Sequence, residues 1–107
     1  MRRLRDPNRK PTHPGELLLH DVLPALGMTQ TELADRLGVS RLTVSELLHS
    51  KRALSADMAI RLARLLRTTP ESWLNMQQAV DLWELTQVDA RYRRIKPVAA
   101  KAVAASA

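Results

Sequence analysis

The sequence contains no cysteine and no phenylalanine, and only two tryptophans and one tyrosine represent the aromatic residues. The absence of cysteine excludes disulfides and thiol chemistry. Because aromatic side chains are so rare, Leu, Ala, Val and Met must fill the interior, which suits helices better than strands. No apolar run approaches the length that crosses a membrane, and no signal-peptide core follows the basic start. These absences indicate an all-α protein without a membrane segment, which we expect to be cytoplasmic.

Positive charge is concentrated at the two ends of the chain. The net charge is +6, yet residues 1–10 and 89–107 each carry five basic side chains and one acidic one, while residues 11–88 are mildly acidic. We therefore expect a flexible basic arm over residues 1–12, a folded domain over 13–88, and a basic, Ala-rich, disordered tail over 89–107. Beside a DNA-binding domain, such basic ends can follow phosphates.

The first predicted helix begins at the sequence HPGE of residues 13–16. Pro14 fits the first helical turn, where its missing N–H costs nothing. Pro24 lies inside the same apolar run, so we expect the helix to kink or tighten there. Gly27 ends it.

Two further helices are predicted towards the C-terminus. Ser55 caps a fourth helix that runs to about Arg67. Thr69 caps a fifth helix that reaches Leu85 or Val88. With the two helices described next, the chain contains five helices joined by short connections.

Residues 30–49 contain two short helices joined by a tight turn. Thr29 and Ser40 are suitable N-caps, and Gly38 lies where the first of these helices must end. The positions expected to face inward are apolar: Leu33, Ala34, Leu37, Val39, Val44, Leu47 and Leu48. This spacing is typical of a helix-turn-helix, although a helical hairpin without DNA function can share it.

In a helix-turn-helix, the second helix enters the major groove and its N-terminal residues contact base edges. Arg41 suits a bidentate contact with guanine, and Leu42 or Thr43 can pack on a thymine methyl group. Glu46 either accepts a hydrogen bond from cytosine, orients Arg41, or only faces solvent. The candidate DNA-binding residues, phosphate contacts included, are Gln30, Thr31, Ser40, Arg41, Leu42, Thr43, Ser45, Glu46, His49, Lys51 and Arg52.

Other kinds of site are weakly supported. His13, Glu16 and His20 could share a helix face, but two histidines and one carboxylate occur often by chance. No Ser–His–Asp or paired-carboxylate arrangement stands out. We therefore expect no metal, no cofactor and no catalytic residue, so the protein is not expected to be an enzyme.

Four apolar residues recur at helical spacing on the fifth predicted helix: Trp73, Met76, Val80 and Trp83. This stripe either packs on the fourth helix or forms a twofold interface. Two tryptophans exceed what so small an interior can hold, so we expect part of the stripe to form a homodimer. The two recognition helices would then lie ~34 Å apart.

Several segments together resemble the Hig-type antitoxins, which are Xre-like, phage-repressor-like helix-turn-helix proteins. These segments are HPGELL at 13–18, the helix-turn-helix, SADMAIRLA at 55–63, WLNMQ at 73–77 and DLW at 81–83. The resemblance covers about residues 11–86 and leaves out both basic ends. His49 stands where many relatives have Asn.

The resemblance implies a five-helix, phage-repressor-like HigA-type domain that dimerises and binds an inverted-repeat operator before its own operon. It also implies neutralisation of a small HigB-like toxin that cleaves mRNA. One alternative is a stand-alone Xre-type repressor without a toxin, against which the HPGE and WLNMQ segments argue. The other is a protein-interaction module without DNA binding, against which Arg41 and the basic ends argue.

Overall fold

The computed structural model describes residues 9–88 and 90–99, and every regular element of that part is helical. In chain order the elements are α1 (Pro14–Leu17), η1 (Leu18–Val22), α2 (Leu23–Leu26), α3 (Gln30–Leu37), α4 (Arg41–Leu48), α5 (Ala56–Leu66), α6 (Pro70–Val88) and η2 (Ala90–Arg94). Because α1, η1 and α2 follow one another without a break, they form one helix. The predicted all-α domain of five helices is confirmed, with η2 as an additional short turn.

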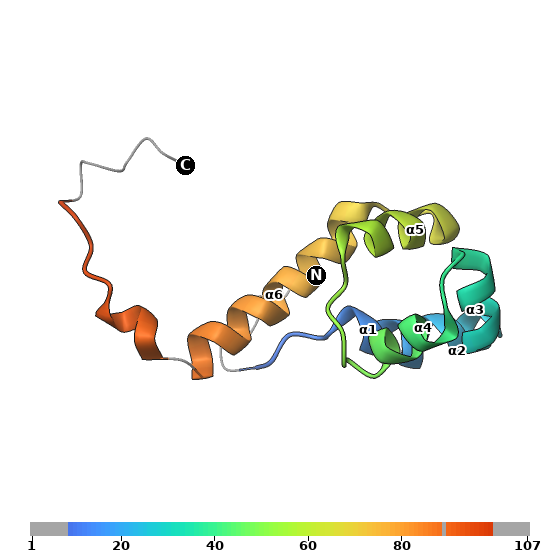
Figure 1. Ribbon diagram of the computed structural model, residues 1–107, viewed down its shortest axis with the longest axis horizontal. Coiled ribbons are helices and arrows are strands. Elements are labelled where there is room, and N and C mark those ends of the chain that lie inside the picture. Colours follow the sequence, from blue (N-terminus) through green and yellow to red (C-terminus); the bar gives the residue numbers. More distant parts are fainter. Residues whose placement is uncertain (1–8, 89, 100–107) are drawn as a thin grey trace, which may run out of the picture.

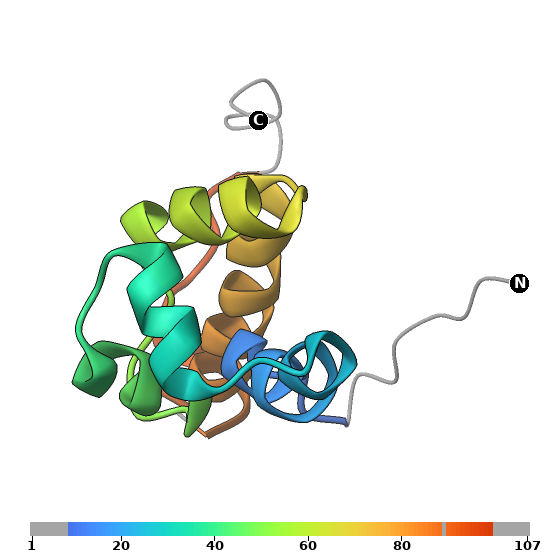
Figure 2. The same cartoon turned by 90° about the vertical axis from the view of Figure 1, so that its right-hand side faces the viewer.

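The helices form a bundle from which α6 leads away (Figure 1). α3 packs on α4, α1 packs on α4, and α5 packs on both α3 and α6. In Figure 2, α5 lies on one side of the bundle, the α1–α2 helix lies on the other, and α3 spans the distance between them. None of the helices in the described part of the chain has the length and apolar character of a membrane-crossing segment.

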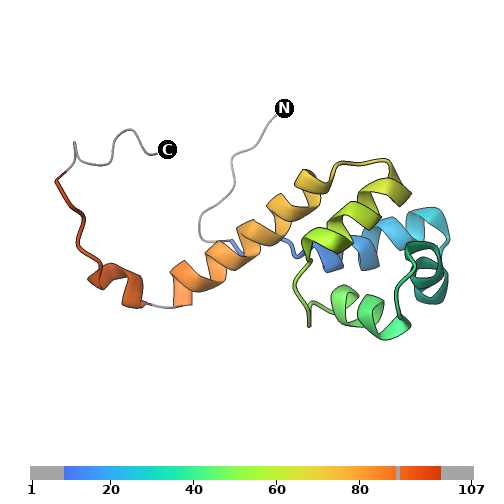
Figure 3. The same ribbon diagram turned by 45° about the horizontal axis from the view of Figure 1, so that its top comes forward.

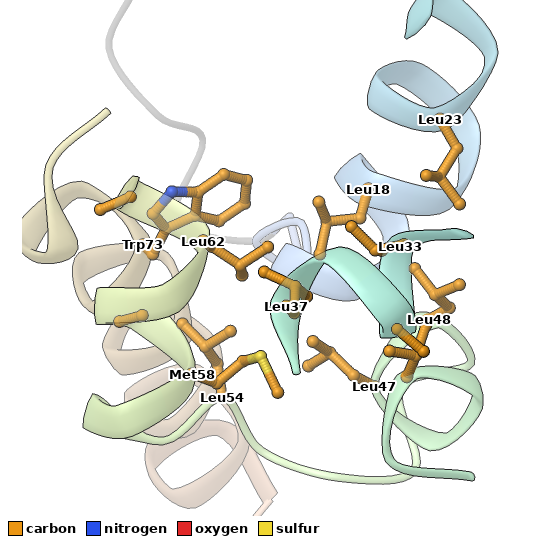
Figure 4. Close-up of a cluster of buried hydrophobic side chains, with 14 residues drawn as sticks. Leu18, Leu23, Leu33, Leu37, Leu47, Leu48, Leu54, Met58, Leu62 and Trp73 are labelled. Atoms are coloured by element: carbon orange, nitrogen blue, oxygen red, sulfur yellow. The ribbon is translucent and has the colours of Figure 1, made fainter. Parts of the chain in front are cut away.

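Leucine is the most frequent residue of the core (Figure 4). Leu18, Leu33, Leu47 and Leu62 come from four different elements and are all at most 1% exposed. Trp73 adds one large ring, and its indole N–H donates to Thr68 Oγ1 at 2.7 Å. Truncating one of these leucines to alanine is expected to cost about 2–5 kcal/mol of stability, because no other large side chain can fill the space.

The first helix widens before Pro24, where the sequence led us to expect a kink or a tightened turn. The N–H of Leu23 donates to the carbonyl of Leu18, five residues earlier, which makes η1 a π-helical turn. In a regular α-helix the ring of Pro24 would collide with the carbonyl of His20 and leave it unpaired. The wider turn removes this conflict, and Gly27 then ends the helix with φ at +62°.

The predicted helix starts are confirmed. Three side chains each accept a hydrogen bond from the backbone N–H three residues further on: Thr29, Ser55 and Thr69. Glu32 lies three residues after Thr29, as in a capping box, but its carboxylate accepts from Arg36 at 2.9 Å. The Glu32 carboxylate therefore forms an ion pair with a residue one helical turn later, in place of a hydrogen bond with the backbone N–H of Thr29.

The ends of the domain differ from the expectation. Pro11, which we assigned to the flexible arm, is buried. Lys10 Nζ lies 3.3 Å from Glu84 Oε2 and 5.9 Å from the centre of the Trp83 ring, so this segment packs on α6. Within the predicted disordered tail, η2 is helical. The remainder of the arm, residues 1–8, and of the tail, residues 89 and 100–107, lies outside the described residues.

Only the first part of α6 belongs to the core. Trp73, Gln77 and Val80 are buried, whereas no side chain of residues 81–87 is buried. Figure 3 shows this second part running beyond the bundle. Leu82 and Leu85 are 55% and 43% exposed there, so this part of α6 presents apolar side chains that the described residues leave accessible.

Candidate nucleic-acid interface

The turn between α3 and α4 has the geometry that glycine permits. Gly38 has φ at +73°, and the N–H groups of Gly38 and Val39 both donate to the carbonyl of Ala34, at 2.9 and 3.1 Å. Only glycine adopts this backbone without strain. Val39 then packs against the core, as predicted, so α4 leaves the turn at a fixed angle to α3.

Arg61 holds the same turn from α5. Its Nη1 donates to the carbonyl of Leu37 at 2.8 Å, and its Nε donates to Asp57 Oδ2 at 2.8 Å. This role could not be predicted from the sequence, because the spacing of Arg61 along α5 places it on the solvent side. No local signal could have revealed a contact to a carbonyl 24 residues earlier.

The start of α4 is capped as predicted. Ser40 Oγ accepts from the N–H of Thr43 at 3.1 Å and lies 2.9 Å from Thr43 Oγ1. The two hydroxyl groups are therefore linked to each other at the N-terminal end of α4. That end carries the positive pole of the helix, which attracts phosphate.

The two faces of α4 are sharply divided. Val44, Leu47 and Leu48 are buried, while Arg41 and His49 are exposed and Leu42 is 66% exposed. The outer face of α4 therefore presents Arg41, Leu42 and His49 to solvent. Thr43 and Ser45 are half-buried at the border of this face.

The candidate residues of α3 lie at its N-terminus. Thr31 is exposed and Gln30 is half-buried. Both belong to the first turn of the helix, where short polar side chains and free N–H groups can hold a phosphate. The structure thus gives this helix start the accessibility that such a contact requires.

Glu46 does not orient Arg41, which corrects one of the expected alternatives. Its Oε1 accepts from Arg52 Nη2 at 2.7 Å and from Arg52 Nε at 3.1 Å. Arg52 and Lys51 lie in the connector between α4 and α5, and both are exposed. This ion pair ties the connector to the outer face of α4, and it therefore brings two cations beside that helix.

The connector is also anchored from inside. The N–H of Leu54 donates to Gln77 Oε1 at 2.8 Å, and Gln77 Nε2 donates to Asp81 Oδ1 at 2.9 Å. Gln77 is only 6% exposed, so this amide is one of the few buried polar groups of the domain. The role of Gln77 could not be predicted from the sequence, because a glutamine inside a helix gives no local signal of its partner.

The four residues of the predicted dimer stripe differ in how far they are buried. Trp73 and Val80 are 4% and 2% exposed within a single chain, so their assignment to a surface interface is wrong. Met76 and Trp83 are half-buried. Trp73 turns inward because the bundle has a site for one indole, formed at the start of α6 where α5 covers it.

Of the three residues considered as a metal site, His13, Glu16 and His20, the first has a structural role. His13 is the N-cap of α1, and its Nδ1 accepts from the N–H of Gly15 at 2.9 Å. Burial lowers the pKa of His13 below its ordinary value, against the opposing effect of Glu16 and other nearby acceptors. A neutral imidazole in this position can act as the acceptor that the cap requires.

The comparison with known proteins agrees with this geometry. Residues 22–74 match the helix-turn-helix family HTH_3. The chain is 46% identical over 82 residues to YbaQ of Escherichia coli K12, an uncharacterized HTH-type transcriptional regulator, with 77% of this chain and 73% of that protein covered. It is 42% identical over 98 residues to antitoxin HigA-1 of Vibrio cholerae, with 89% and 90% covered.

A solved structure extends the likeness to three dimensions. Antitoxin HigA of Pseudomonas aeruginosa, determined with the higBA promoter, is similar to this chain with a TM-score of 0.78 and 34% sequence identity. The match covers 84% of this chain and all of that one.

Proposed function

The chain belongs to the helix-turn-helix family that includes HTH-type regulators and HigA antitoxins, and from this premise we propose that it is an antitoxin and a transcriptional autorepressor. It binds the operator before its own operon, and it neutralises a cognate HigB-like toxin that cleaves mRNA. The observation that carries this proposal is the exposed, capped start of α4, with Arg41 and Leu42 facing away from the core.

The proposed DNA interface divides into base and phosphate contacts. Arg41, Leu42 and Thr43 at the start of α4 would meet base edges. Phosphate contacts would come from the starts of α3 and α4 and from the connector. The residues proposed for the phosphate contacts are Gln30, Thr31, Ser40, Ser45, Lys51 and Arg52, and Glu46 and His49 complete the outer face of α4.

The ion pair between Glu46 and Arg52 gives Glu46 a supporting role in this interface. A carboxylate facing the DNA backbone would repel phosphate, but the bound guanidinium offsets its charge. Arg52 is in turn held close to α4, where it can reach the backbone strand beside the recognition helix. We therefore assign Glu46 to the positioning of Arg52 and assign no cytosine contact to it.

The proposed active form is a homodimer. An inverted-repeat operator requires two recognition helices related by twofold symmetry, about 34 Å apart. The exposed side chains of Leu82 and Leu85, with the half-buried Trp83, form the surface that we assign to the interface. This assignment keeps the predicted stripe on α6 but moves it towards the C-terminus, because Trp73 and Val80 are already covered.

Neither a catalytic group nor a cofactor forms part of this proposal. An operator-binding protein acts by occupying DNA and an antitoxin acts by binding its toxin, so no bond needs to be broken. The proposed site of action is the cytoplasm, where the operator lies.

The test combines the two activities. The chain is co-expressed with the reading frame beside its gene, the complex is purified, and the DNA upstream of the operon is footprinted. We expect a stable complex with a small basic protein, relief of the growth arrest which that protein causes alone, and a protected inverted repeat. A neighbouring gene whose product neither arrests growth nor binds the chain would refute the antitoxin function.

A stand-alone repressor is the second candidate. It is supported by the 46% identity to YbaQ, which is described only as an HTH-type transcriptional regulator. The same footprint distinguishes the two functions, since the repressor would protect its operator without any toxin-like neighbour. Failure to bind either DNA or a toxin would leave the protein-interaction module.

A further inference from the structure

His13 lies where three parts of the chain meet. It lines a groove of about 230 Å³ between the start of α1, the connector after α4, and α6. His13 is only 6% exposed. The charged residues that line this groove are Lys10, Glu16, Lys51, Arg52, Asp81 and Glu84.

The hydrogen bonds of His13 determine its protonation state. Nδ1 accepts from the N–H of Gly15 at 2.9 Å, so Nδ1 carries no proton and the imidazole is neutral with its proton on Nε2. Lys51 and Arg52 of the connector line the same groove as His13. The ring therefore lies between the start of α1 and the connector that carries two of the proposed phosphate contacts.

The same corner sets the position of α4. A Cβ atom added to Gly15 would overlap the carbonyl group of Leu47, which means that α1 lies directly against the backbone of α4. The side chain of Arg52 is at the same time bonded to Glu46 on α4. The recognition helix is thus held at its C-terminal part by the start of α1 on one side and by the connector on the other.

Protonation of His13 would break its hydrogen bond with the N–H of Gly15. An imidazolium carries a proton on Nδ1, and this N–H would face the N–H of Gly15 with no acceptor between them. Burial lowers the pKa of His13, while Glu16, the Arg52 backbone, Glu84 and Asp81 act in the opposite direction. The folded state therefore favours the neutral ring, and the unfolded chain binds a proton more readily.

We propose that His13 is a positioning residue for DNA binding: its neutral ring holds the start of α1 against the connector and α4, and protonation releases them and weakens operator binding. This inference rests on the proposed DNA-binding function. The affinity for operator DNA then depends on His13, a side chain that does not contact DNA.

The test is the affinity for the upstream operator DNA between about pH 5.5 and 8, measured for the wild type, His13→Asn and His13→Ala. Asparagine is a strong N-cap whose amide oxygen accepts from the N–H of Gly15 but does not titrate. We expect the wild-type affinity to fall only at a pH below the ordinary histidine pKa of about 6.5, because burial lowers the pKa of His13 in the folded domain. His13→Asn should lose this fall, and His13→Ala should bind about fivefold more weakly per protomer at pH 8, since that is the typical contribution of one cap.

Two other histidines provide the controls. His20 is exposed on η1, and His49 lies on the DNA-facing side with Nδ1 2.8 Å from the carbonyl of Ser45. His20→Asn should keep the wild-type pH dependence. His49→Asn removes the histidine of the proposed interface itself, and in this background His13→Asn should still flatten the remaining profile.

The inference would be overturned if His13→Asn left the pH profile of operator affinity unchanged in the His20→Asn or the His49→Asn background. Urea unfolding of the same proteins at pH 8 and pH 6 gives a readout without DNA. The wild type should lose stability between these pH values relative to His13→Asn, because its unfolded state binds more protons. If His13→Asn does not fold, His13→Asp supplies the cap instead. A wild type that binds no operator at any pH would refute the proposed function, and an equal loss of stability in both proteins would refute the role of His13.

Discussion

Arg52 donates two hydrogen bonds to a single carboxylate oxygen of Glu46, from Nη2 at 2.7 Å and from Nε at 3.1 Å. This pair joins the connector after α4 to the outer face of α4 itself. Both side chains are partly exposed, so the pair contributes little to folding, about 0–1 kcal/mol. Its consequence is geometric, because it directs a permanent positive charge along the helix that is proposed to enter the major groove.

Replacing Arg52 by glutamine should weaken binding to operator DNA and to a random duplex by similar factors. A phosphate contact carries no sequence information, and its loss should reduce the salt dependence of log K by about one unit of slope. Binding is measured at several salt concentrations on both duplexes. Arg64→Gln, on the exposed side of α5, is the matched control and should leave the slope unchanged. A loss confined to the operator would contradict the phosphate assignment.

Replacing Arg41 by alanine should instead reduce discrimination. A bidentate contact with guanine distinguishes the correct base by about 1–3 kcal/mol, so operator binding should fall by roughly 5- to 150-fold. Binding to random DNA should fall much less, because only the electrostatic contribution of one positive charge is lost. The two affinities are compared at one salt concentration. Equal losses on both duplexes would show that Arg41 contacts only phosphate.

Introducing glutamate at both Leu82 and Leu85 should convert the proposed dimer to a monomer. Each substitution places a charge on a surface that the dimer would bury, where an unpaired charge is strongly unfavourable. Light scattering after gel filtration measures the mass. Ile60→Glu on α5 is the control, because Ile60 is 56% exposed and Leu82 is 55% exposed. A wild type that is monomeric at micromolar concentration would refute the assignment before any variant is made.

Gly15→Ala should be the most damaging of the glycine substitutions. Its Cβ would overlap the backbone carbonyl of Leu47, and a backbone atom in the core cannot rotate away. We expect a loss of about 3 kcal/mol, the upper part of the range for overpacked sites. Gly27→Ala is the control, because no atom lies near its added Cβ and only its positive φ of +62° is strained. That control should cost about 1 kcal/mol in the same denaturant titration.

Gln77→Leu should destabilise the connector from within. The substitution keeps a similar volume but leaves the N–H of Leu54 buried without an acceptor, which costs about 1–3 kcal/mol. Gln78→Leu lies next to it on the exposed side of α6 and should change stability by less than about 0.5 kcal/mol. Denaturant unfolding measures both variants. Equal stability of the two would mean that the buried bond contributes nothing measurable.

The sequence alone was sufficient for the five main helices and for the face of α4 that points outward. N-caps at Ser40, Ser55 and Thr69 and the left-handed turn at Gly38 were predicted correctly, because each depends on hydrogen bonds within three or four residues. The apolar spacing of α3 and α4 identified which side of α4 is outward, since helical periodicity is also a local property. The exposure of Arg41 followed directly from it.

The tertiary structure decided every contact that joins distant parts of the chain. Trp73 and Trp83 lie on the same helix, yet only Trp73 enters the core, because α5 covers the start of α6 and ends before its second part. Arg52 pairs with Glu46 and Arg61 bonds the carbonyl of Leu37 for the same kind of reason. Charge and periodicity give a side chain its face on a helix, but the packing of helices determines which partner stands opposite that face.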